Sequence, residues 1–136
     1  MVENISPAQA WAALRSDPKA QLVDVRTDAE WSLIGIPDLI DAGKQVVLLQ
    51  WQTYPTMAPN PHFLDQLKEV GFTPDQHLYF LCRTGGRSMA AARAAEAAGF
   101  SHTFNIVDGF EGPPDSAGHR GTQSGWKAER LPWRQK

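Results

Sequence analysis

The chain has 136 residues, 42% hydrophobic and 21% charged, a composition typical of one globular domain over residues 1–136. Thirteen basic side chains nearly balance fifteen acidic ones, which argues against a surface built for nucleic acid or membrane. No apolar stretch approaches the roughly 20 residues that cross a bilayer, and one cysteine with four histidines does not favour a structural metal site.

The N-terminal residues predict a helix followed by a strand. Ser6 supplies a hydroxyl that can cap a helix, and Pro7 suits the first helical position because its missing N–H has no partner there. The helix is expected to end near Asp17, since the residue before a proline avoids the helical conformation. The apolar run over residues 21–25 lies between turn residues and predicts a buried strand.

Helices and strands alternate through the rest of the chain. Asn60 is expected to cap a helix over residues 61–70, with Gly71 just past its end. The other expected segments are a helical turn at 28–33, a strand at 45–51, a proline-rich loop at 51–61, a strand at 77–82, a helix at 88–98, a strand at 103–107 and a packed terminal segment at 126–133. This order predicts an α/β domain with a central parallel sheet of about five strands, flanked by helices on both faces.

The strand at 77–82 ends at Cys82, the only cysteine, and a glycine-rich turn connects it to the next helix. Ligands bind at the carboxyl ends of the strands in a parallel sheet. A glycine-rich turn before a helix gathers N–H groups that bind anions, and two arginines add positive charge. The predicted anion-binding loop comprises Arg83, Thr84, Gly85, Gly86, Arg87 and Ser88.

Two interpretations of Cys82 compete. A lone cysteine in a soluble protein is usually a small buried hydrophobe. A structural cysteine, however, does not need two glycines and two arginines beside it. A helix N-terminus and cationic neighbours favour the thiolate, which is the attacking species in sulfur chemistry. The sequence therefore predicts that Cys82 is a nucleophile.

The segment from Cys82 to Ser88 resembles the active-site loop of the rhodanese domains, which commonly reads Cys-Arg-x-Gly-x-Arg-Ser. The resemblance covers nearly the whole chain through further blocks at residues 22–31, 91–100, 105–110 and 125–133. It implies a sulfurtransferase that needs no cofactor. Its Cys82 would carry a sulfur atom, as a persulfide, from a small anionic donor such as thiosulfate to a thiophilic acceptor.

Three charged residues of the upstream block are expected to support the loop rather than to react. Asp24 and Arg26 follow a strand end and are interpreted as an ion pair that buttresses the loop, and Glu30 is given the same structural role. The chain departs from the family's Gly-His-Ile-x-Gly-Ala pattern at residues 35–39, where the histidine is missing. Trp51 and Tyr54 begin the long loop that follows and could edge the pocket.

Three other functions stay open. The domain could be a relay that receives persulfide from one protein and delivers it to another, or a regulatory binding module. A cysteine-based phosphatase or arsenate reductase is the lesser alternative. By the same resemblance, the six residues from Cys82 to Arg87 have the sulfurtransferase length, whereas the dual-specificity phosphatases that share the fold have a loop one residue longer. The absence of a secretion signal makes a cytoplasmic location the expectation.

Overall fold

The computed structural model describes residues 1–136 and contains a five-stranded parallel sheet. The strand order across the sheet is β1 (Glu3–Ile5), β8 (His102–Ile106), β7 (His77–Leu81), β2 (Ala20–Asp24) and β4 (Val47–Leu48). Four α-helices accompany it: α1 (Pro7–Ser16), α2 (Asp28–Ile34), α3 (Phe63–Glu69) and α4 (Gly86–Ala97). None of these helices has the length and apolarity needed to cross a membrane.

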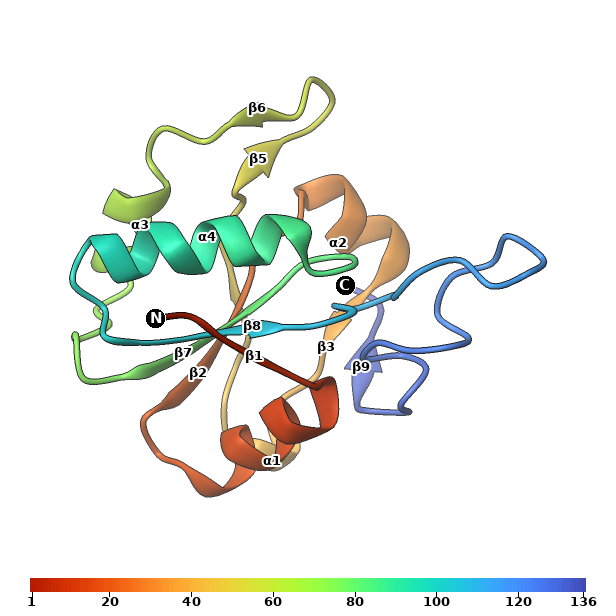
Figure 1. The fold of residues 1–136 in the computed structure, drawn as a ribbon, viewed down its shortest axis with the longest axis horizontal. Coiled ribbons are helices and arrows are strands. Elements are labelled where there is room, and N and C mark those ends of the chain that lie inside the picture. Colours follow the sequence, from red (N-terminus) through yellow and green to blue (C-terminus); the bar gives the residue numbers. More distant parts are fainter.

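The sheet is covered on both faces (Figure 1). Successive residues of β7 belong to opposite clusters: Leu78 and Phe80 pack with α3 and α4, whereas Tyr79 and Leu81 pack with α1 and the C-terminal segment. Side chains of a strand point alternately to its two faces, so a strand buried on both sides must be apolar throughout. The structure confirms the α/β fold expected from the sequence.

The two edge strands differ most from the expected segments. β1 was not expected; it pairs with β8 in parallel and directly precedes α1. The strand expected over residues 45–51 is reduced to two residues in β4. Beyond it, Leu49 and Trp51 still donate to the carbonyl groups of Asp24 and Val25, so the chain follows β2 without a regular ladder. Edge strands pair on one side only, and their sequence signal is correspondingly weak.

The proline-rich loop contains a small hairpin, β5 (Gln52–Thr53) with β6 (Ala58–Pro59). The residues at the base of this hairpin delay the start of α3, which begins at Phe63 instead of residue 61. The predicted cap was wrong: Asn60 uses its Nδ2 atom to donate to the Gln50 carbonyl and to Gln66, and its Oδ1 atom accepts from the His62 N–H. The asparagine therefore closes the hairpin rather than capping the helix.

The C-terminal segment packs back on the body, as expected. Trp126 is fully buried, its indole N–H donates to the Pro132 carbonyl at 2.7 Å, and its ring meets Trp11 edge-on with centroids 6.0 Å apart. The chain then ends in β9 (Trp133–Arg134), which pairs with β3 (Ile36–Pro37). Trp126 therefore joins α1 to the last residues of the chain.

Replacing Trp126 with alanine should lower the free energy of unfolding by about 3–5 kcal/mol, because it empties a fully buried aromatic site. Urea denaturation followed by far-UV circular dichroism measures this change. Ile40→Ala, at a side chain that is 76% exposed, should change it by less than about 0.5 kcal/mol. Equal effects of the two substitutions would contradict a packing role for the Trp126 ring.

Candidate active site

Cys82 lies immediately after the last residue of β7, at the carboxyl edge of the parallel sheet. Its side chain is buried, and its Sγ atom accepts a hydrogen bond from the Gly85 N–H at 3.0 Å. Gly85 has a φ of 116°, in the left-handed region that favours glycine, and this lets the chain turn back toward the sulfur. As a result α4 begins at Gly86, two residues before the expected start.

The Cys82 loop, residues 82–88, presents backbone N–H groups that have no acceptor within the chain. Only the Gly85 N–H is used, by the sulfur. Unpaired N–H groups at a helix N-terminus bind anions, assisted by the helix dipole. Among residues 83–88, the free N–H groups are those of Arg83, Thr84, Gly86, Arg87 and Ser88.

The predicted loop residues have different surroundings. Ser88 is buried and its hydroxyl oxygen lies 3.2 Å from Cys82 Sγ. The Arg83 and Thr84 side chains are exposed, and Arg83 has no ion-pair partner. One hydroxyl and one backbone N–H therefore lie within hydrogen-bond distance of the sulfur, and the unpaired Arg83 guanidinium lies at the exposed edge of the loop.

A chain of polar side chains behind the sulfur was missed by the sequence analysis. The Ser88 hydroxyl donates to Asn105 Oδ1 at 2.5 Å, and Asn105 Nδ2 donates to Asn4 Oδ1 at 3.0 Å. Ser88 has one hydroxyl proton, so it can donate either to Asn105 or to a Cys82 thiolate. A polar Asn105 within the expected strand at 103–107 was the available signal, because an amide that becomes buried in a sheet needs partners.

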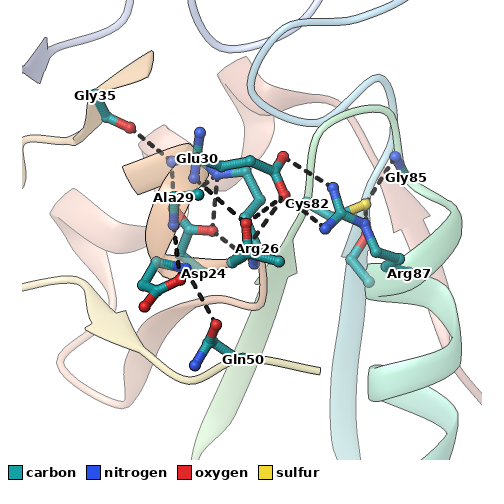
Figure 2. A network of polar contacts seen from close by, with 12 residues as sticks. Asp24, Arg26, Ala29, Glu30, Gly35, Gln50, Cys82, Gly85 and Arg87 are labelled. Atoms are coloured by element: carbon teal, nitrogen blue, oxygen red, sulfur yellow. Dashed lines mark hydrogen bonds and ion pairs between the residues drawn. The ribbon is translucent and has the colours of Figure 1, made fainter. Parts of the chain in front are cut away.

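Glu30 holds Arg87 in place beside the sulfur (Figure 2). The Arg87 guanidinium donates two hydrogen bonds to the Glu30 carboxylate, at 2.7 and 3.0 Å. Burial alone would raise the pKa of Glu30, but the hydrogen bonds and charge of Arg87 outweigh it and lower that pKa. Burial alone would lower the pKa of Arg87, yet Glu30, with smaller contributions from the charges of Cys82 and Asp24, raises it. Glu30 therefore fixes the position of the Arg87 guanidinium.

Asp24 and Arg26 form the expected ion pair, and both side chains are fully buried. Arg26 Nη2 lies 2.6 Å from Asp24 Oδ2 and also donates to the Gly35 carbonyl at 2.8 Å. The guanidinium lies over the Phe110 ring, 4.2 Å from its centroid. Neither side chain hydrogen-bonds to the Cys82 loop. The pair therefore supports the loop only indirectly, through the backbone segments that Arg26 connects.

The segment after β8 holds the backbone of the Cys82 loop. The Phe110 N–H donates to the Cys82 carbonyl at 2.8 Å, and the Gly112 N–H donates to the Arg83 carbonyl at 3.2 Å. At Gly109, with a φ of 54°, a Cβ atom would lie 2.3 Å from the Cys82 carbonyl oxygen. Only glycine allows the two backbone segments to approach this closely.

An open groove of about 560 Å³ lies beside the loop, between α2 and the β5–β6 hairpin. We call it the hairpin groove. Tyr54 lines it, as expected for a residue that could edge the pocket, whereas Trp51 packs edge-on against Phe63. A larger hollow of about 940 Å³ beside β4 contains no residue of the Cys82 loop. The hairpin groove is lined by Thr27, Ala29, Glu30, Leu33, Ile34, Gln52, Tyr54, Met57, Arg83 and Arg87.

Comparison with known proteins places this architecture among related chains. The family model for the STR4 middle domain matches residues 2–136. An uncharacterized protein of Rickettsia conorii is 39% identical over 133 residues, which are 97% of this chain and 97% of that protein. The chloroplastic rhodanese-like domain-containing protein 4 of Arabidopsis thaliana is 31% identical over 129 residues, 94% of this chain and 25% of the plant protein.

A solved structure repeats the whole arrangement. The crystal structure of Rv0390 from M. tuberculosis matches with a TM-score of 0.89 at 44% sequence identity. The match covers 99% of this chain and 98% of that one. The overall arrangement of this chain is therefore similar to that of the M. tuberculosis protein over nearly the full length of both.

Replacing Glu30 with glutamine should make stability less dependent on pH. The pKa of Glu30 is lowered in the folded chain, so its ionised form stabilises the fold above the ordinary value of 4.5. That contribution is lost as the pH falls below 4.5 and through the lower folded pKa. We expect Glu30→Gln to cost about 1–3 kcal/mol at pH 7 and progressively less below pH 4.5.

Urea denaturation at several pH values measures this difference without the screening that guanidinium chloride would introduce. Glutamine can retain the hydrogen bonds that Glu30 makes with Thr27 at the start of α2, so the substitution isolates the charge. A difference that stays constant from pH 7 down to pH 3 would contradict the role assigned to the Glu30–Arg87 pair.

Gly109→Ala should displace the Cys82 loop and destabilise the protein. Gly118→Ala is a matched control, because Gly118 has a φ of 81° and a methyl group at its Cα would meet no other atom within 4 Å. The control should cost about 1–2 kcal/mol for the left-handed backbone, and Gly109→Ala about 1–3 kcal/mol more for the clash. Urea denaturation compares them, and equal costs would show that the close approach at Gly109 is unimportant.

Proposed function

Because this chain belongs to the rhodanese-like domain family, we propose that it is a sulfurtransferase in which Cys82 carries a sulfur atom as a persulfide. One observation carries the proposal. The Cys82 sulfur lies at the carboxyl end of β7, inside a loop that offers unpaired N–H groups and two guanidinium groups. This arrangement suits a negatively charged sulfur species rather than a neutral substrate.

In the first half of the proposed reaction, the Cys82 thiolate attacks the outer sulfur of a donor such as thiosulfate. A new S–S bond forms on Cys82, the S–S bond of thiosulfate breaks, and sulfite leaves with the electron pair. Sulfite is a stable anion, so the step requires no general base or acid. The Gly85 N–H, 3.0 Å from the sulfur, and the Ser88 hydroxyl, 3.2 Å from it, can both donate hydrogen bonds to the thiolate.

The persulfide that results carries its charge on the outer sulfur. The free N–H groups between Arg83 and Ser88 can stabilise this charge, as preorganised donors stabilise anions in other enzymes. In the second half of the reaction, a thiophilic acceptor attacks the outer sulfur and Cys82 leaves as the thiolate. With cyanide as the acceptor, the product is thiocyanate.

A persulfide relay between proteins is the second candidate, and the hairpin groove favours it. The groove places apolar side chains next to Arg83 and Arg87, which thiosulfate and cyanide would not need. A phosphatase is less well supported, because the loop from Cys82 to Arg87 is six residues long, which is the length in the sulfurtransferases that this chain resembles. The identities of the sulfur donor, the sulfur acceptor and any protein partner are parts of this proposal.

Treatment of the reduced protein with thiosulfate should add the mass of one sulfur atom, and cyanide should remove it as thiocyanate. Intact-mass spectrometry and a thiocyanate assay measure the two steps. Cys82→Ser is the matched control, because it keeps the size of the side chain but cannot form a persulfide. It should gain no sulfur and produce no thiocyanate.

A folded parent protein that gains no sulfur would contradict the transfer from a small donor. The same preparation should then be tested with p-nitrophenyl phosphate. Hydrolysis that depends on Cys82 would favour the phosphatase alternative, whereas its absence would leave transfer from a protein persulfide as the remaining route.

A further inference from the structure

Three apolar side chains stand out into solvent around the hairpin groove. Leu33, on the last turn of α2, is 78% exposed, and Tyr54 and Met57, at the tip of the β5–β6 hairpin, are 62% and 36% exposed. Single exposed apolar residues are common, but several gathered around one groove mark a binding surface. Tyrosine and arginine, both present here, are also enriched among the residues that dominate interface energies.

The hairpin is fixed to the body of the protein at its base. Trp51 packs edge-on against Phe63 of α3, with ring centroids 5.1 Å apart. The Gln50 side chain accepts a hydrogen bond from the Asp28 N–H at 3.1 Å, which ties the irregular segment between β4 and the hairpin to the start of α2. Both walls of the groove therefore belong to one connected structure.

The charges at the inner end of the groove are unequal. Arg87 is neutralised by Glu30 through two hydrogen bonds, but Arg83 has no ion-pair partner. The groove thus combines an apolar wall with one free positive charge, close to the loop that holds Cys82. A ligand that complements this groove carries an apolar group on one side of a reactive sulfur and a negative charge on the other side.

We propose that the hairpin groove docks a polypeptide acceptor whose cysteine lies between an apolar residue and an acidic residue. The inference rests on the proposed function, since it concerns the second half of the reaction. Sites for small molecules bury most of the ligand surface, whereas Leu33 and Tyr54 protrude from the surface and would leave a small ligand largely uncovered. Protruding side chains suit a partner that surrounds them.

The transfer to this acceptor balances without an oxidant. The anionic outer sulfur of the Cys82 persulfide takes the proton of the acceptor thiol. The acceptor thiolate then attacks that outer sulfur, and a bond forms between the two sulfur atoms. The original S–S bond breaks, and Cys82 leaves as the thiolate with the electron pair. The proton stays on the transferred sulfur, so the acceptor becomes a persulfide and Cys82 is ready for another donor.

The test measures how fast the Cys82 persulfide is discharged by two blocked tripeptides, Leu-Cys-Glu and Ser-Cys-Glu, under identical conditions. The full chain is loaded with thiosulfate, freed of excess donor and followed by intact mass. We expect the leucine peptide to react about tenfold faster, because its side chain is buried against the groove. In the double variant Leu33→Ser with Tyr54→Ser, that ratio should fall to about one.

Ile40→Ser is the matched control, because Ile40 is 76% exposed and lies in the other hollow. It should keep the tenfold preference of the parent. Arg83→Gln should remove a second preference, for Leu-Cys-Glu over Leu-Cys-Gln. Discharge by cyanide is measured on each variant, so that the peptide rates are compared with the intrinsic reactivity of the same persulfide.

The outcomes separate the two proposals. No loading of the parent with sulfur would overturn the proposed function. Normal loading and cyanide discharge, with no preference between the two peptides or with a preference unchanged in the double variant, would overturn the docking surface alone. If 2-phenylethanethiol reacts as fast as Leu-Cys-Glu and loses the same factor in the double variant, the groove accepts small apolar thiols, and the polypeptide assignment is overturned.

Discussion

The buried ion pair between Asp24 and Arg26 is the constraint on which the site depends. Two opposite charges without exposed surface remain buried only if they are paired and hydrogen-bonded. Arg26 is paired with Asp24, donates to the Gly35 carbonyl and lies over the face of Phe110, while its Nη1 atom is buried without a hydrogen-bond partner. The end of β2, the residue before β3 and the segment after β8 are therefore joined at one point. The Cys82 loop rests on that junction, because the Phe110 N–H donates to the Cys82 carbonyl.

A second pair, Glu30 with Arg87, fixes the side chains near the sulfur on the side that faces the hairpin groove. It connects the first turns of α2 and α4, so the positive charge of Arg87 is held near the sulfur instead of moving freely in solvent. The same pair leaves Arg83 as the free cation at the rim. The site thus separates into an inner part that suits an inorganic anion and an outer groove whose apolar wall suits a larger acceptor.

Much of the site could be predicted from local sequence. Cys82, the glycines of the loop and the two arginines follow one another directly, and their position between a strand and a helix indicates their arrangement. Asn105 and Asn4 could not be assigned in this way, because they reach Ser88 only after β8 and β1 are paired beside β7. The requirement for glycine at position 109 was likewise hidden, since it comes from the distant backbone of Cys82.

The α/β class, the order of the main helices and strands, and the position of Cys82 before a glycine-rich turn are readable from the amino-acid sequence. These follow from short-range properties, namely apolar runs, capping residues and turn residues, which act within a few positions of the chain. The short edge strands, the early start of α4 and the hairpin groove became visible only in the folded chain. Edge pairing depends on a neighbouring strand, and the groove exists only where α2 meets the hairpin, two segments about twenty residues apart whose contact no local pattern encodes.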